Sequence, residues 1–127
     1  MLSEIAAYLD ASTSLTTGTD LFAVEMPPDP NTAVSLHEYD GQGPQDTFGT
    51  FSAYEVSRLH VRVRAATYPE AMTLASTVNA ALYSIVETAV GGHTYHRVQQ
   101  ISVWTVQEID SKVRVIISCN YEVTRVP

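Results

Sequence analysis

The sequence predicts an α+β fold in which a mostly antiparallel sheet of about five strands carries two helices, in the order α-β-β-β-α-β-β. Three observations point to this class. Residues 55–66 and 112–125 alternate apolar with polar side chains, which is typical of half-buried strands. Residues 68–90 repeat apolar side chains at the spacing of one helix face. The chain has 127 residues, 45% of them hydrophobic and 17% charged, as expected for one globular domain over residues 1–127.

The first part of the chain predicts one helix and two strands. Apolar residues recur at helical spacing from Leu2 to Leu9, and Ser3 can cap this helix. Residues 21–25 predict a short strand, which ends at a loop rich in proline because proline cannot donate a ladder hydrogen bond. Residues 32–39 predict a second strand.

A long loop is expected at residues 40–54. This segment contains three glycines and one proline, together with the aromatic residues Phe48, Phe51 and Tyr54. Loops of this length in compact proteins are usually functional or disordered. Aromatic rings favour an apolar contact, on the same subunit or on a neighbour, so these three residues are candidate interface residues.

The second part of the chain predicts a long helix between strands. Residues 67–70 (Thr-Tyr-Pro-Glu) form a capping box with proline in the first turn, which favours a helix start. The helix should run over residues 68–90, end at Gly91 and Gly92, and cover the apolar face of the sheet. Residues 93–109 and 112–125 predict two long strands that form a hairpin.

Charge is unevenly distributed along the chain. All seven Lys and Arg residues lie at or after Arg58, so residues 1–57 hold nine acids and no Lys or Arg. An acidic flank and a mildly basic flank suit head-to-tail contact between identical copies, and plain solubility is the alternative. The net charge of −7 argues against a DNA-binding protein, because affinity for nucleic acid needs clustered cations.

The strand at residues 55–66 carries a dense set of cationic positions. Arg58, His60, Arg62 and Arg64 point away from the apolar face, and Arg62 and Arg64 should share one outward surface. We predict that this face meets acids of an adjacent subunit or another protein, with the acids of residues 1–57 as the expected partners. A solvated sheet face is the alternative.

The sequence contains no recognisable catalytic or metal-binding set. His93 and His96 lack a third ligand at zinc spacing, so they are expected to be surface histidines. Cys119 alternates with core residues and should be a small buried residue, and Trp104 should be a packing residue. We therefore expect no enzyme activity, no metal and no cofactor. No apolar run approaches the length of a membrane span.

Several segments taken together resemble one protein family. They are the helix at residues 2–9, the Met-Pro-Pro-Asp-Pro loop at 26–30, the strand at 59–64, the helix opening at 66–71 and the terminal hairpin from Tyr95 to Val126. In size, element order and these segments, the chain resembles the tail terminator (tail completion or minor capsid) proteins of long-tailed bacteriophages.

The resemblance implies a structural protein of the virion. Proteins of this family form a ring, usually of six copies, on the end of the tail tube, where the ring stops tube growth and provides a surface for joining the head. The implied partners are other copies of the chain, the tail tube protein and a head-closure or neck protein. DNA is expected to pass through without specific binding, and no membrane is involved. The implied location is the junction of tail and neck, after assembly in the host cytoplasm.

Two alternatives remain open at this point. The chain could be another neck protein, such as a head-closure or adaptor protein, since such proteins share size and ring symmetry. It could also be a small α/β ligand-binding domain that forms a dimer through a sheet edge.

Overall fold

The computed structural model describes residues 1–45 and 54–126. Two helices and seven strands follow one another along the chain, and the α+β class is confirmed. Their bounds are α1 Leu2–Ser12, β1 Leu21–Ala23, β2 Ala33–Gln45, β3 Tyr54–Ala65, α2 Tyr68–Tyr83, β4 Val86–Val90, β5 His93–Gln100, β6 Thr105–Ile109 and β7 Val115–Arg125. None of the helices in these ranges is both long and apolar enough to cross a membrane.

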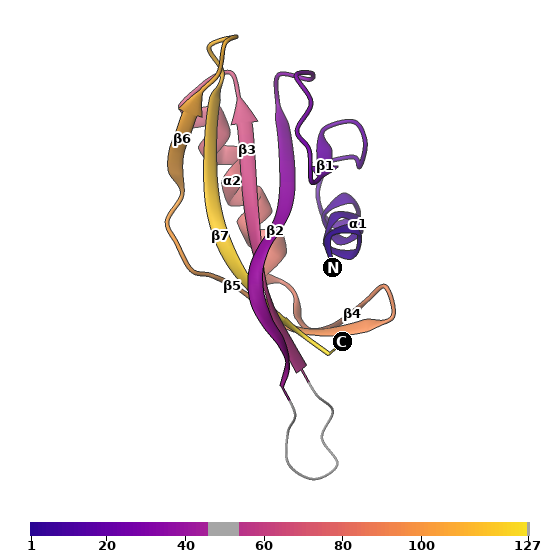
Figure 1. Cartoon of the computed structure of the whole chain (residues 1–127). Coiled ribbons are helices and arrows are strands. Elements are labelled where there is room, and N and C mark those ends of the chain that lie inside the picture. Colours follow the sequence, from indigo (N-terminus) through magenta and orange to yellow (C-terminus); the bar gives the residue numbers. More distant parts are fainter. Residues whose placement is uncertain (46–53, 127) are drawn as a thin grey trace.

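All described strands belong to one curved sheet (Figure 1). Its order is β1-β2-β3-β7-β5-β4, and β6 also pairs with β7. Every pairing is antiparallel except that of β1 with β2, which is parallel. The expected number of about five strands was too low. The predicted helix over residues 68–90 is divided into α2 and β4, and the predicted strand over residues 93–109 is divided into β5 and β6.

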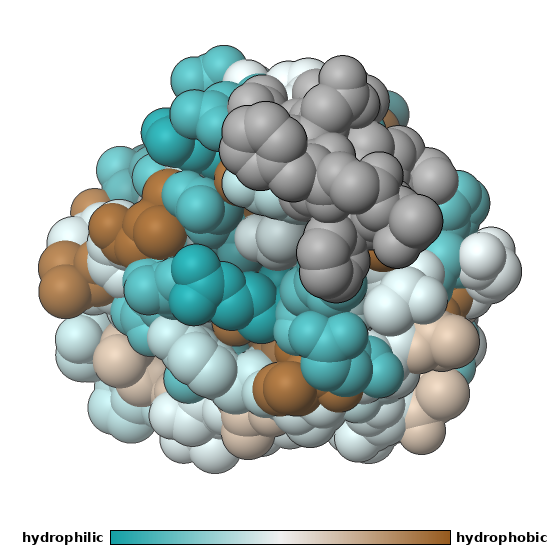
Figure 2. Space-filling model, turned by 90° about the horizontal axis from the view of Figure 1, so that it is seen from below, coloured by the Kyte–Doolittle hydropathy of each residue, from teal (hydrophilic) through white to brown (hydrophobic). Residues whose placement is uncertain are grey.

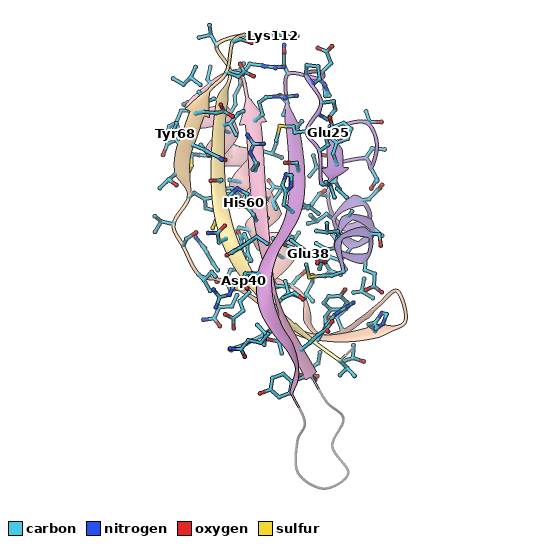
Figure 3. The ribbon with its side chains drawn as sticks, viewed as in Figure 1. Glu25, Glu38, Asp40, His60, Tyr68 and Lys112 are labelled. Atoms are coloured by element: carbon cyan, nitrogen blue, oxygen red, sulfur yellow. The ribbon has the colours of Figure 1, made fainter. Side chains whose placement is uncertain are left out.

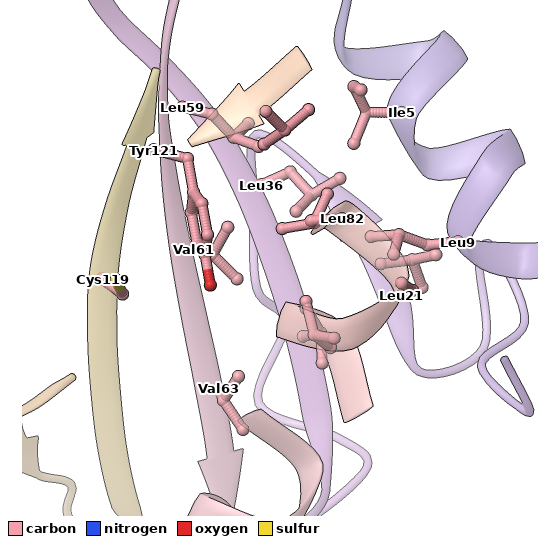
Figure 4. Packing of buried hydrophobic residues seen from close by; sticks show 14 of the residues in the cluster. Ile5, Leu9, Leu21, Leu36, Leu59, Val61, Val63, Leu82, Cys119 and Tyr121 are labelled. Atoms are coloured by element: carbon pink, nitrogen blue, oxygen red, sulfur yellow. The ribbon is translucent and has the colours of Figure 1, made fainter. Parts of the chain in front are cut away.

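The apolar core lies between the sheet and the two helices. Helix α2 lies behind the central strands and α1 lies beside β1 and β2 (Figure 1). Figure 4 shows Ile5 and Leu9 of α1 and Leu82 of α2 among Leu36 and Val61 of the sheet, and all five side chains are fully buried. Each such side chain stabilises the fold by roughly 1.5–3 kcal/mol relative to exposure.

Helix α2 begins as predicted but ends earlier. The Thr67 hydroxyl accepts a hydrogen bond from the Glu70 amide at 3.4 Å. The helix ends at Tyr83, and residues 86–90 form β4 instead of its last turns. The prediction of a helix over 68–90 was therefore wrong in its second part.

The reason for the early helix end lies in the residues of β4. Val86, Thr88 and Val90 are β-branched and alternate along the strand, which favours extended backbone. Gly91 and Gly92 both have positive φ, at 58° and 85°, and turn the chain from β4 into β5. The two glycines therefore form a hairpin turn and do not cap a helix.

The predicted strand over residues 93–109 is also divided. β5 pairs with residues 121–125 of β7 and β6 pairs with residues 115–118, so both lie along the same edge of β7. Residues 101–104 connect the two. β7 begins at Val115 instead of residue 112, because the Asp110 carboxylate accepts hydrogen bonds from the amides of Lys112 and Arg114 and so shapes the turn.

Part of the expected loop at residues 40–54 is strand. Residues 40–45 belong to β2 and Tyr54 belongs to β3, so the two strands form an arm at one end of the sheet, where residues 55–57 of β3 are also paired with β7 (Figure 1). We call residues 39–45 and 54–57 the arm. Its pairing is interrupted at two places by register shifts, and the first includes Gly41, where a Cβ atom would collide with the carbonyl oxygen of Val56. Phe48 and Phe51 lie outside the described residues.

Candidate protein-interaction surface

The sheet face opposite the helices carries the cationic positions of β3. The register places His60 between His37 of β2 and Asn120 of β7, and Arg62 between Ser35 and Ser118. These side chains alternate with the buried apolar residues, so they lie on the opposite side of the sheet. We call this surface the helix-free face, and His60 marks its centre in Figure 3.

Two of its arginines bind acids of the same chain. The Arg62 guanidinium donates to Glu108 at 2.9 Å and to Gln107 at 3.1 Å. Arg58 lies 4.0 Å from Glu122 and stays more than one-third exposed. These intrachain acids lie in the second half of the sequence, whereas acids of residues 1–57 were the expected partners. The structure describes no partner chain, so the expected contact with another subunit stays a prediction.

Several acids of residues 1–57 form ion pairs with Lys or Arg of the same chain. Arg125 binds Glu4 and Glu55, and Lys112 lies 3.5 Å from Asp29. Cations of the same chain therefore compete for some of these acids, although residues 1–57 contain no Lys or Arg. The fold brings residues from the end of the chain next to its beginning.

Arg64 is not an outward-facing residue. Only 3% of its surface is exposed, and its guanidinium donates to the backbone carbonyls of Pro30 and Asn31. Arg114 is also buried, and it donates to the Pro28 carbonyl at 2.6 Å. Burial and the neighbouring Arg114 lower the pKa of Arg64.

The proline-rich loop explains why Arg64 is covered. Proline-rich backbone has few amide donors but keeps its carbonyl acceptors, and buried carbonyls need a donor. Two arginines supply these donors at the end of the sheet. Arg64 thus shares the strand face of Arg62, as predicted, but it holds a loop of its own chain and does not offer charge to a partner.

The centre of the helix-free face is a half-buried group of rings. His60 Nδ1 lies 2.6 Å from the Asn120 side-chain oxygen, and its ring centre lies 6.3 Å from that of His37. Tyr39 meets His60 edge-on and is partly exposed. Burial lowers the pKa of His37, and the positive charge of Arg62 lowers it further. The surface therefore combines aromatic groups with two partly exposed ion pairs, Arg58–Glu122 and Arg62–Glu108, and aromatic residues and arginine are enriched at protein interfaces.

Residues 8–127 match the family model described as bacteriophage tail terminator protein. The chain belongs to the bacteriophage tail terminator family. The resemblance stated from the sequence is thereby confirmed, and the chain is a structural protein of the phage tail.

Two solved structures share the fold of this tail terminator family member. One chain comes from the virion of a native gene transfer agent (GTA) particle, with 17% identity, a TM-score of 0.61, and coverage of 97% of this chain and 84% of that chain. A second solved chain has 12% identity and a TM-score of 0.52, with coverage of 95% and 88%. At these identities the likeness concerns the fold. No curated protein sequence matches significantly.

A polar cluster at the root of the arm was missed by the sequence analysis. Arg125 lies between Glu4 and Glu55, at 3.0 Å and 2.5 Å, and the Tyr95 hydroxyl donates to Glu4 at 2.6 Å. His93 Nδ1 lies 2.8 Å from the same carboxylate. Burial opposes ionisation of Glu4, but the hydrogen bonds from Tyr95 and His93 outweigh it and lower the pKa of this carboxyl. Only the tertiary register brings these residues together, so no sequence pattern could have shown them.

The remaining residues singled out from the sequence lie in structural positions. Cys119 is buried, burial raises the pKa of its thiol, and Trp104 packs edge-on against Tyr121, so both were predicted correctly as packing residues. His93 is partly covered by Glu4, and His96 lies near Glu87 on the surface. Within residues 1–45 and 54–126, no group of three or more His, Cys, Asp or Glu side chains could hold a metal ion.

Proposed function

We propose that this tail terminator family protein forms a ring of six copies on the end of the tail tube. The ring stops growth of the tube and provides the surface to which the head is joined. The match of residues 8–127 to the family carries this proposal. The arm and the helix-free face support it, because both expose aromatic residues of the kind that protein interfaces bury.

The helix-free face is suited to contact with an acidic neighbour. The side chains of Arg58 and Arg62 are partly exposed, and Tyr39 adds an exposed aromatic ring. Contacts of this kind fix orientation and speed up association more than they add affinity. The neighbour is another copy of the chain or the tail tube protein, and the arm contributes Tyr54, which is only half-buried within its own subunit.

DNA passes through this ring without being held. Each copy has a net charge of −7, and duplex affinity depends on neutralising phosphates with clustered cations. Of the arginines on β3, Arg64 is buried and Arg62 is paired with Glu108. The ring lies in the virion at the junction of tail and neck, after assembly in the host cytoplasm.

Electron microscopy of the purified protein tests the ring directly. We expect ring-shaped particles with a central hole and a mass of several copies by native mass spectrometry. Labelled protein added to tail tubes should then appear at one end of each tube. A stable dimer that binds a small ligand would overturn the proposal, and so would rings that bind the head and never the tail tube.

A further inference from the structure

We infer that neighbouring copies join through opposite edges of the sheet, with the β6 edge of one copy lying on the β1 edge of the next. This inference rests on the proposed ring and names the two surfaces that form it. The sheet order runs from β1 at one end to β4 at the other, and β6 pairs with β7 on the side of β7 that faces away from β1. One copy can therefore use both edges at once.

The β6 edge presents an apolar ridge. All five residues of β6 are exposed, and among the described strands β6 pairs only with β7. Val103, Val106 and Ile109 are 71%, 52% and 63% exposed, and we call these three residues the β6 ridge. Figure 2 shows hydrophobic residues at several places around the rim of the molecule, including its left side, on which β6 lies in Figure 1. An exposed apolar edge strand promotes pairing with another chain, so natural proteins usually cover or charge it.

The ridge is not protected by free charges. Glu108 is bound to Arg62 on the helix-free face, and Asp110 is bound to Arg114. Val106 lies opposite Ile117 and therefore points to the side of the sheet that carries the helices. The acidic residues of this segment thus point elsewhere, and the valine remains available for contact.

The β1 edge offers two hollows beside one another. One has a volume of about 350 Å³ and the other about 370 Å³, and both are lined by Thr17 and Ala23. The second lies between α1 and β1, on the helix side of the sheet, and small residues of α1 such as Ala7 and Ala11 line it. Apolar side chains of the size of valine and isoleucine fit such hollows.

Contact at the β1 edge has to be made largely by side chains. The outer backbone groups of Leu21 are already used, since its amide donates to Thr16 and its carbonyl accepts from Gly18. A strand from another copy could not extend the ladder along this part of β1. A ridge of side chains that enters the hollows satisfies this condition.

Charge complementarity favours a second copy of this chain as the occupant. Asp10, Asp20 and Glu25 lie along the α1–β1 flank, and residues 1–57 contain no Lys or Arg. The turn that follows β6 carries Lys112, which is 53% exposed and lies 3.5 Å from the exposed Asp29 of its own chain, whereas Arg62 of β3 is already paired with Glu108. Figure 3 shows Glu25 on the β1 side and Lys112 at the end of the β6–β7 hairpin. A contact between two different surfaces of identical copies closes into a ring when the rotation allows it.

Cysteine cross-linking tests the pairing of the two edges. One variant carries Val106→Cys and another carries Ala23→Cys, and the native Cys119 is buried. We expect a disulfide-linked dimer when the two variants are mixed and oxidised, and none with either variant alone. The double variant should give a ladder of covalent oligomers. A dimer formed by Val106→Cys alone would show contact between two β6 edges and would overturn the inference.

Charge placed on the ridge provides a second test. We expect Val103→Asp combined with Val106→Asp to keep the fold, since both positions are exposed, and to weaken association at least about tenfold. Val86→Asp is the matched control, because Val86 is 62% exposed on β4, and it should assemble like the parent. Rings formed equally well by the ridge variant would overturn this inference and leave the proposed ring intact. A parent protein that stays monomeric would overturn both.

Discussion

The guanidinium of Arg125 lies 3.0 Å from the carboxylate of Glu4, although the two residues are 121 positions apart in the chain. The same guanidinium binds Glu55 at the root of the arm, and it lies over the Tyr95 ring with its central carbon 5.9 Å from the ring centre. One side chain therefore ties the first helix, the last strand and the arm together. These elements come from distant parts of the chain, and the cluster holds α1 and the arm against the end of β7.

Replacing Arg125 should destabilise the fold. Arg125→Ala leaves two partly buried carboxylates without their cation, and we expect the free energy of unfolding to fall by about 2–4 kcal/mol. Arg97→Ala is the control, because Arg97 is exposed and the described residues give it no ion-pair partner. That variant should change stability by no more than about 0.5 kcal/mol. Urea unfolding measures both, and equal losses would contradict the role given to the cluster.

Acid should weaken the same cluster. The pKa of Glu4 is lower in the folded protein than the unfolded value of 4.5, so the unfolded state binds the proton more readily. The stability contributed by the ionised carboxylate is fully present above pH 4.5 and is lost as the pH falls through the folded pKa. We expect Glu4→Gln to lower stability at neutral pH and to make it less dependent on pH in acid. Unfolding curves on both sides of pH 4.5 measure this. A parent and variant with the same acid slope would exclude Glu4 as the responsible group.

Gly91 is required by the position of Glu4. A Cβ atom at Gly91 would collide with the Glu4 side chain, which cannot move without losing its bonds to Tyr95 and Arg125. Gly92 also has positive φ, but a Cβ atom there meets nothing within 4 Å. Gly91→Ala and Gly92→Ala should share a strain cost of about 1 kcal/mol, and Gly91→Ala should lose about 1–3 kcal/mol more. Thermal unfolding of the two variants separates the cost of the collision with Glu4 from the cost of backbone strain. Equal losses of stability in the two variants would exclude the collision.

The sequence predicts those features that depend on local patterns. The alternation in residues 55–66 and 112–125 and the Thr67 cap each predict one element without help from the rest of the chain, although the last strand begins at Val115. The end of α2 was missed because residues 84–90 continue an apolar pattern that fits a helix and a strand equally well. The break between β5 and β6 follows from pairing with β7, which no local pattern encodes.

For the candidate surface too, the sequence predicts local features but not contacts with distant residues. The alternation in β3 places Arg58, Arg62 and Arg64 on one side of the strand, and the register confirms this. What covers each arginine depends on distant residues, namely the loop at residues 28–31 for Arg64 and Glu108 for Arg62. Burial of a charge by a loop from another part of the chain cannot be read from the strand itself.

Two arginines of β3 should therefore respond differently to substitution. Arg64→Ala removes a buried side chain and leaves the part-buried contacts of the Pro30 and Asn31 carbonyls without this donor, and we expect a loss of about 1–3 kcal/mol in unfolding free energy. Arg58→Ala removes only a long, exposed pair with Glu122 and should change stability by at most about 0.5 kcal/mol. Chemical unfolding of both variants measures the difference. If Arg58→Ala were the more harmful, the structural role of Arg64 would be wrong.

Assembly should depend on the exposed arginines of the helix-free face. Arg58→Glu combined with Arg62→Glu reverses two charges that are partly exposed, and Arg62 also loses Glu108. We expect the variant to fold with a loss of no more than about 1 kcal/mol, because pairs of this kind contribute little to stability. Ring formation or attachment to tail tubes should fail, since like charges across an interface repel. Ser76→Glu, on the exposed side of α2, adds negative charge away from this face and should assemble normally. Analytical ultracentrifugation and microscopy of decorated tubes measure assembly separately from folding. A charge-reversed protein that forms rings and binds tubes like the parent would show that the helix-free face is solvated in the virion.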